Sequence, residues 1–206
     1  AVMDADEIRA VAEFCVDNDI DVIADEIYAA LTYEGDHTSI ASMPGMRERT
    51  IVINGFSKAY AMTGLRLGYA LGPAEAIASM NRVHQYTMLS APTTAQFAAI
   101  EALRSCEDAV TEMATEYNRR RRFVLSRFEE MGLDCFRSRG AFYAFPECGG
   151  DDQAFAEDLL EAEGVAVVPG SVFGEGGEGH LRVSYATGMR ELKTAMNRLE
   201  TFYRNR

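Results

Sequence analysis

The chain has 206 residues, of which 48% are hydrophobic and 25% are charged, a balance that is typical of folded globular proteins and excludes a disordered or fibrous chain. Its 20 lysines and arginines and 32 aspartates and glutamates give a formal charge of −12, and such a negative field repels the phosphate backbone of nucleic acids. No apolar run approaches the roughly 20 residues that span a bilayer. Neither a nucleic acid nor a membrane is therefore predicted as a partner.

Cysteine, histidine and lysine usage adds further expectations. The four cysteines form no CxxC pair and the three histidines are scattered, so neither a metal site nor a disulfide framework is predicted. Together with the absence of a signal-peptide pattern, this favours a cytoplasmic location. Lys58 and Lys193 are the only lysines. An acid excess with so little lysine is typical of proteins adapted to high salt, where charge repulsion is screened.

The first half of the chain alternates helical and strand patterns. The D-x-x-E capping box of Asp4 and Glu7 opens a helix. Short apolar strands are predicted at residues 21–24, 50–54 and 65–71. Helices are predicted to follow from Pro73 to the break at 90–92, then over 93–104 and 107–131. The four consecutive arginines at 119–122 are predicted to form a solvated, ion-paired surface of the last helix.

The pattern changes after Gly132. Strands are predicted at residues 134–137, 141–145, 165–168 and 181–185, and helices at 152–163 and 189–204. Residues 1–110 therefore have an α/β pattern and residues 111–206 an α+β pattern, which predicts two domains joined by the long helix. The G-x-G-x-x-G string at 174–179 precedes a strand and contains two glutamates. We interpret it as a loop, because a dinucleotide-binding turn needs a strand before it and a helix after it.

Two polar residues follow the first predicted strand. Asp25 comes directly after the apolar residues 21–24, and the carboxyl end of such a strand usually faces a ligand crevice. A carboxylate there needs a cationic partner, although Asp25 could equally cap the loop. Tyr28, three residues on, is compatible with a core position or with ligand binding.

Lys58 follows the second predicted strand, in a chain that otherwise uses arginine. Only a lysine amine can form a Schiff base, because a guanidinium stays protonated. Ser57 precedes it and Arg66 follows eight residues later, and a hydroxyl with a guanidinium suits a bound phosphate. Considered singly, Ser57 and Arg66 are as readily surface residues.

Taken together, these residues carry a family pattern. The strings are D-E-I-Y at 25–28, S-K-x-x-x-x-T-G-x-R-x-G-Y at 57–69 and L-R-V-S-Y at 181–185. The chain resembles, over essentially its whole length, the class I aminotransferases of fold type I, the aspartate aminotransferase group that uses pyridoxal 5′-phosphate (PLP). The resemblance implies that residues 1–110 are the C-terminal remainder of a large three-layer αβα PLP-binding domain and residues 111–206 a small α+β domain.

The resemblance also implies a role for each site residue. Lys58 is expected to hold PLP as a Schiff base, Asp25 to pair with the pyridine nitrogen, and Tyr28 to donate to the phenolic oxygen. Ser57 and Arg66 are expected to bind the phosphate. Arg182, within L-R-V-S-Y, is expected to bind the substrate α-carboxylate through two parallel hydrogen bonds, whereas an ion pair on a strand is its alternative interpretation. The implied substrates are an amino acid and a 2-oxo acid, and the implied assembly is a homodimer.

Departures from the family pattern leave alternatives open. Gly55 stands where many relatives have a serine that binds phosphate, and the N-terminal half of the family's sequence is not present here. The chain is therefore expected to be a fragment that is inactive alone and whose sheet has unpaired edges. A PLP-dependent carbon–sulfur β-lyase and a PLP-sensing regulatory domain would keep the same residues.

Overall fold

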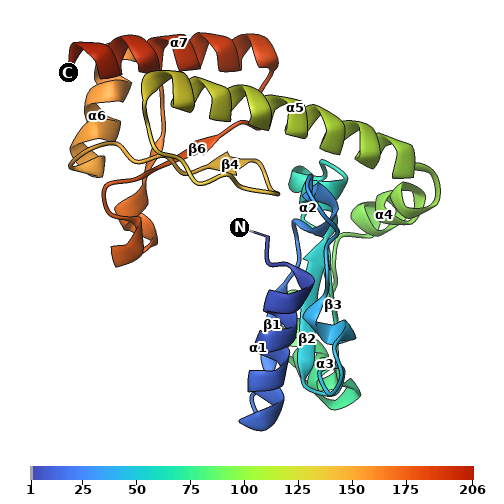
Figure 1. The fold of residues 1–206 in the computed structure, drawn as a ribbon. Coiled ribbons are helices and arrows are strands. Elements are labelled where there is room, and N and C mark those ends of the chain that lie inside the picture. Colours follow the sequence, from blue (N-terminus) through green and yellow to red (C-terminus); the bar gives the residue numbers. More distant parts are fainter. Residues whose placement is uncertain (1) are drawn as a thin grey trace. The chain divides into compact units, whose positions relative to one another are not determined.

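The computed structural model describes residues 2–206, and Figure 1 traces their helices and strands. The chain divides into two compact units, one ending at Ala114 and the other spanning Thr115–Arg206. The division falls within helix α5 (Glu107–Met131), close to the boundary predicted at 110/111. No helix in the described residues is long and apolar enough to cross a membrane.

The first unit is built on a three-stranded sheet. Its strands are β1 (Val22–Asp25), β2 (Thr50–Gly55) and β3 (Gly68–Leu71), in the order β1-β2-β3. The β1–β2 pair is parallel and the β2–β3 pair antiparallel. Helix α1 (Ala5–Asp17) begins at the predicted capping box, in which Asp4 and Glu7 exchange side chain–backbone hydrogen bonds.

A small core lies between α1 and the segment before β2. It contains the buried side chains of Ala12, Cys15, Ile40 and Met46. Ala12 and Cys15 recur on α1 at helical spacing, so one face of the helix is buried and the other is solvated.

The third strand begins later than predicted. A 3₁₀ turn covers Thr63–Leu65, and Arg66 then adopts a left-handed conformation with φ 54°. The pairing with β2 starts only at Gly68, opposite Gly55. The prediction of a strand from residue 65 was therefore wrong at its start, because a turn interrupts an apolar run whose periodicity alone does not reveal it.

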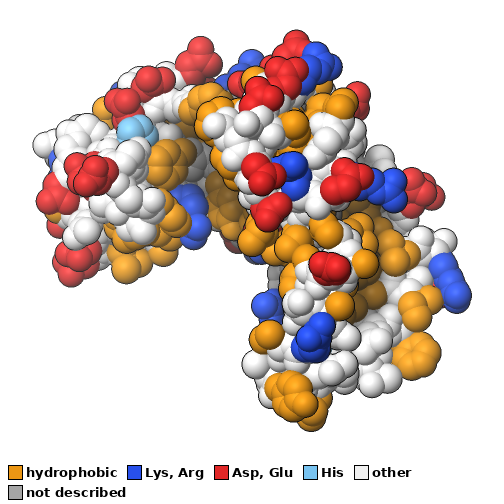
Figure 2. Space-filling view, turned by 90° about the horizontal axis from the view of Figure 1, so that it is seen from below, with side chains coloured by type: hydrophobic (Ala, Val, Ile, Leu, Met, Phe, Trp, Pro, Cys, Tyr) orange, Lys and Arg blue, Asp and Glu red, His pale blue; other side chains and the backbone are white. Residues whose placement is uncertain are grey.

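Three helices follow the sheet, close to their predicted ranges. They are α3 (Ala74–Thr87), α4 (Thr93–Ser105) and α5. α3 contains no buried residue, and orange hydrophobic side chains reach the surface at many places in Figure 2. In the first unit the large, more than half-exposed apolar side chains are those of Phe14, Ile23, Leu71, Val83, Tyr86, Met88, Leu89, Phe97 and Leu103. So much exposed apolar surface is typical of a face that another polypeptide covers.

The second unit packs two helices around a small antiparallel sheet. Helices α6 (Asp152–Glu163) and α7 (Met189–Asn205) match their predicted ranges within a residue or two. The sheet has the order β4-β6-β5, so that β6 (Leu181–Ser184) lies between β4 (Tyr143–Ala144) and β5 (Val168–Pro169). The strand predicted at 134–137 is wrong, since that segment forms only an isolated bridge between Cys135 and Pro146.

Gly55 is a place where the backbone of β3 leaves no room for a side chain. A Cβ atom at Gly55 would lie 2.9 Å from the Leu67 carbonyl oxygen and 3.0 Å from the Gly68 Cα. We expect Gly55→Ser to lower the free energy of unfolding by about 1–3 kcal/mol, because the two strands must separate locally. Gly64→Ser is the matched control, since a Cβ there meets nothing within 4 Å. Equal urea midpoints for the two variants would contradict this expectation.

The four consecutive arginines do not share one environment. Arg119 and Arg120 both bind Glu116, and their hydrogen bonds lower the pKa of that carboxyl to about 2. Arg121 instead is 1% exposed and donates to the Ser138 carbonyl oxygen. The predicted solvated surface is thus confirmed for the first pair and wrong for Arg121.

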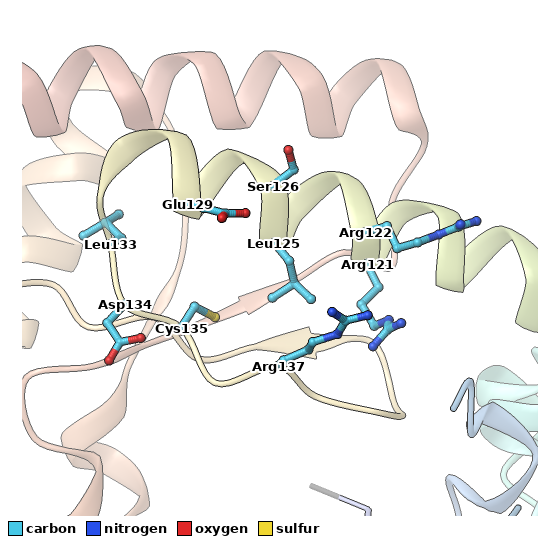
Figure 3. Close-up of a pocket in the computed structure, with 9 residues that line it drawn as sticks. All are labelled: Arg121, Arg122, Leu125, Ser126, Glu129, Leu133, Asp134, Cys135 and Arg137. Atoms are coloured by element: carbon cyan, nitrogen blue, oxygen red, sulfur yellow. The ribbon is translucent and has the colours of Figure 1, made fainter. Parts of the chain in front are cut away.

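A hollow of about 370 Å³ lies beside α5, and Figure 3 shows Arg121 among the side chains that line it. Its guanidinium points towards the loop that carries Arg137, whereas the Arg122 side chain points along the helix and away from that loop. Burial raises the pKa of the Cys135 thiol, which lines the same hollow.

Arg121 and Arg122 offer a matched test of this difference. We expect Arg121→Ala to lower the free energy of unfolding by about 2–4 kcal/mol, because it leaves a cavity and an unpaired carbonyl at Ser138. Arg122→Ala, at an exposed position, should change it by less than about 0.5 kcal/mol. Chemical denaturation of both variants measures the difference, and similar losses would show that the buried contact with Ser138 contributes little.

Candidate active site

One edge of the first unit's sheet gathers five of the six residues singled out in the sequence. Asp25 ends β1 and pairs in register with Ile53 of the parallel strand β2. β2 ends at Gly55 and leads into helix α2 (Phe56–Ala59), which carries Ser57 and Lys58. β3 runs antiparallel, so its beginning lies at the same edge, and Arg66 directly precedes it.

Lys58 and Tyr28 lie beside each other at this edge. The Lys58 Nζ is 5.9 Å from the centroid of the Tyr28 ring, and both residues, like Ser57, are half-buried. Tyr28 stands at the start of a 3₁₀ turn, Ala29–Leu31, that follows β1. The ammonium over an aromatic face is a favourable arrangement, and it fixes a primary amine next to a phenol.

The Asp25 carboxylate has capacity for a cationic partner. Its Oδ1 accepts the backbone N–H of Ile27 at 3.2 Å, which is the local loop contact that the sequence left open as an alternative. It makes no other hydrogen bond or ion pair within residues 2–206, and the residue is exposed. The carboxylate can therefore hold a second donor while it keeps its loop contact.

Arg66 is held by its own turn. Its Nη1 donates to the Thr63 carbonyl oxygen at 2.7 Å, and the side chain is exposed. A guanidinium has five N–H donors, so this one bond leaves it able to bind an anion at the edge that it shares with Ser57.

Arg182 belongs to the second unit, on the central strand β6. Its guanidinium carbon is 4.8 Å from the ring centroid of Tyr143 and 4.8 Å from that of Phe173. No carboxylate pairs with Arg182 in the part of the chain from residue 2 onwards. The alternative prediction for Arg182, an ion pair on a strand, is therefore wrong for the described residues.

Sequence reasoning missed the two rings that hold Arg182. Tyr143 lies on β4 and Phe173 ends the 3₁₀ turn Gly170–Phe173. The glycine-rich segment at 174–179 follows that turn in the sequence. It contains a second 3₁₀ turn, Glu175–Gly177, and leads into β6, so its prediction as a loop is confirmed. No short-range signal connects Phe173 with Arg182, because only the folded turn brings them together.

Comparison with known proteins identifies the family. The profile described as "Aminotransferase class I and II" matches residues 1–199. The chain belongs to this family. Its mixed α/β architecture agrees, since the structure of an aromatic aminotransferase from Pyrococcus horikoshii OT3 superposes with a TM-score of 0.96 at 44% identity, covering 100% of this chain and 57% of that one.

Relatives of this aminotransferase-family chain have diverse names. The aspartate aminotransferase of Pyrococcus abyssi is 44% identical over 100% of this chain and 54% of its own length. The aromatic-amino-acid aminotransferase 2 of Thermococcus litoralis is 43% identical over 97% of this chain and 53% of its own length. The chain thus spans about half the length of the curated relatives it matches.

Proposed function

We propose that the intact protein is a PLP-dependent aminotransferase that moves an amino group from an amino acid to a 2-oxo acid, with this chain supplying the C-terminal part. The observation that carries the proposal is the convergence of Asp25, Tyr28 and Lys58 at one sheet edge, with Ser57 and Arg66 beside them. These residues supply a carboxylate, a phenol and a primary amine at one place, and the Asp25 carboxylate keeps capacity for a further donor.

The chemistry of these donors fits PLP. Lys58 would bind the cofactor aldehyde covalently through its amine, Asp25 would accept a hydrogen bond from the protonated ring nitrogen, and Tyr28 would donate one to the phenolic oxygen. Ser57 and Arg66 would bind the phosphate. The chemistry that the cofactor supplies is withdrawal of electrons from the Cα of the amino acid.

The protein's own groups would then bind, orient and move protons. Asp25 would hold a positive charge on the ring nitrogen by electrostatic attraction. Once the substrate amine has displaced Lys58 from the cofactor, the free Nζ would act as general base towards the substrate Cα–H and then as general acid. Arg182 fixes the substrate carboxylate and hence the orientation of the Cα–H bond.

A homodimer and a complementary N-terminal part belong to the same proposal. They are supported by the exposed apolar side chains of the first unit and by its sheet, in which β1 and β3 are the edge strands among residues 2–206. Unpaired edges of this kind invite association with another strand or chain. This chain by itself is expected to be inactive and to self-associate, and a stable monomer in light scattering would contradict that expectation.

The test is a direct comparison of two reactions in the intact, PLP-loaded protein. We expect amino transfer that depends on an added 2-oxo acid, and no release of pyruvate from cystathionine. Pyruvate release without amino transfer would favour a carbon–sulfur β-lyase. Cofactor binding with neither reaction would favour a regulatory, PLP-sensing domain, and either outcome would overturn the proposal.

A further inference from the structure

We propose that Phe173 and Asp152 are positioning residues for Arg182: Asp152 anchors the turn that places the Phe173 ring over the guanidinium, so that Arg182 binds a carboxylate with its N–H edge. The inference rests on the proposed function for the role of Arg182. Phe173 and Asp152 would set the affinity for the substrate carboxylate without contacting the reacting atoms.

The surroundings of Arg182 explain why its edge is available. The Arg182 guanidinium carbon lies 4.8 Å from the ring centroids of both Tyr143 and Phe173, over their aromatic faces. The five N–H donors of Arg182 form no hydrogen bond within residues 2–206. Arg182 is thus held by two aromatic rings and not by an acidic side chain. An acidic partner would compete with the substrate carboxylate for the guanidinium.

Tyr143 is positioned by the sheet itself. It pairs in register with Ser184, two residues beyond Arg182 on β6. Residues at such diagonal positions share one face of an antiparallel pair, and aromatic side chains reach across that distance. The Tyr143 ring is therefore delivered by strand pairing, whereas Phe173 needs its own support.

The turn that carries Phe173 is anchored at two points. Asp152 is 5% exposed and its Oδ2 accepts the Ser171 backbone N–H at 2.7 Å. That hydrogen bond lowers the pKa of the Asp152 carboxyl. Gly170 donates its N–H to the His180 carbonyl oxygen at 2.8 Å, and a Cβ at Gly170 would lie 2.1 Å from the Gly177 carbonyl oxygen.

The Phe173 ring gains little from burial, since it is 54% exposed. Within residues 2–206, the charged or aromatic group that its ring contacts is the guanidinium of Arg182. A half-exposed aromatic side chain at the end of an anchored turn is better explained by that contact than by core packing.

The first experiment measures steady-state kinetics of the intact protein with pyruvate as the 2-oxo acid. Phe173→Leu is expected to raise the KM for pyruvate about two- to fivefold, with kcat within about twofold, because a cation–π contact at a partly exposed site has that energy. Phe136→Leu is the matched control, since Phe136 is 64% exposed in the same unit and its ring contacts no guanidinium within residues 2–206.

The role of Asp152 is tested with a conservative variant that should restore part of the function and with a control variant at the neighbouring Asp151. Asp152→Ala should raise KM as Phe173→Leu does, Asp152→Asn should recover part of the loss because its carbonyl can still accept from Ser171, and the double variant should add little. Asp151→Ala is the control for a merely structural effect. Asp151 caps α6 by accepting from Gln153 and Ala154, so its loss should lower stability and leave KM unchanged.

A second readout needs no activity. In the arginine-labelled intact protein, the Nε–H signal of Arg182, assigned with Arg182→Lys, should carry a ring-current shift that Phe173→Leu removes and Phe136→Leu keeps. Pyruvate should move this signal, with a midpoint two- to fivefold higher in Phe173→Leu. A shift and midpoint unaffected by Phe173→Leu would overturn the inference. Absence of amino transfer by the unsubstituted protein would instead overturn the proposed function. The NMR measurement would still decide whether Phe173 positions Arg182.

Discussion

Lys58→Ala should reduce amino transfer by the intact protein at least about 10³-fold, because proton transfer by a positioned base alone contributes about 10²–10⁴-fold. It should also abolish the covalent capture of cofactor, since no other side chain at the sheet edge is a primary amine. Rates of the half-reaction with an amino acid, followed by cofactor absorbance, measure both effects.

The chain offers a matched control for this variant. Lys193 is its one other lysine, exposed on α7 in the second unit. Lys193→Ala should leave the rate within about twofold of the parent. Lys58→Arg should be as inactive as Lys58→Ala, because a guanidinium keeps its charge but cannot act as a base at neutral pH. Full activity in either Lys58 variant would remove the basis of the proposed mechanism.

Asp25→Asn should lower the rate about 10²–10³-fold, the range seen when one preorganised electrostatic group is removed from a transition state. The amide keeps the size of the side chain and can still accept the Ile27 N–H, but it carries no charge to hold a proton on a ring nitrogen. Cofactor should still bind through Lys58, so the loss is expected in kcat and in the absorbance of the bound cofactor.

Asp21→Asn is the control for Asp25. Asp21 precedes β1 at the opposite end of the same strand and is exposed, so its substitution changes the net charge equally and should leave kcat unchanged. If the two variants were equally active, Asp25 would be no more than a loop residue that accepts from Ile27.

Much of the fold was predictable because its signals are local. The capping box at Asp4, the proline before α3 and the 3.6-residue apolar period of α5 each fix an element within a few residues. The sheet edge was predictable in part, since the carboxyl ends of parallel strands meet at one edge. That rule brings Asp25 and Lys58 together before any distance is known.

The remainder depends on contacts between distant residues. Arg121 belongs to the same run of four arginines as Arg119, and only its position on the inner face of α5 buries it against Ser138. The turn before β3 and the ring of Phe173 over Arg182 likewise arise from backbone geometry. Residue patterns of period two or 3.6 carry no information about such contacts.

Locating the lysine that captures the cofactor decides whether this sheet edge is the cofactor site. The intact protein is incubated with PLP, reduced with borohydride and digested, and the labelled peptide is identified by mass spectrometry. We predict a stoichiometric label on Lys58, abolished by Lys58→Ala and unaffected by Lys193→Ala. A label on Lys193, or no label on any lysine under conditions where the protein is folded, would contradict the assignment of this sheet edge as the cofactor site.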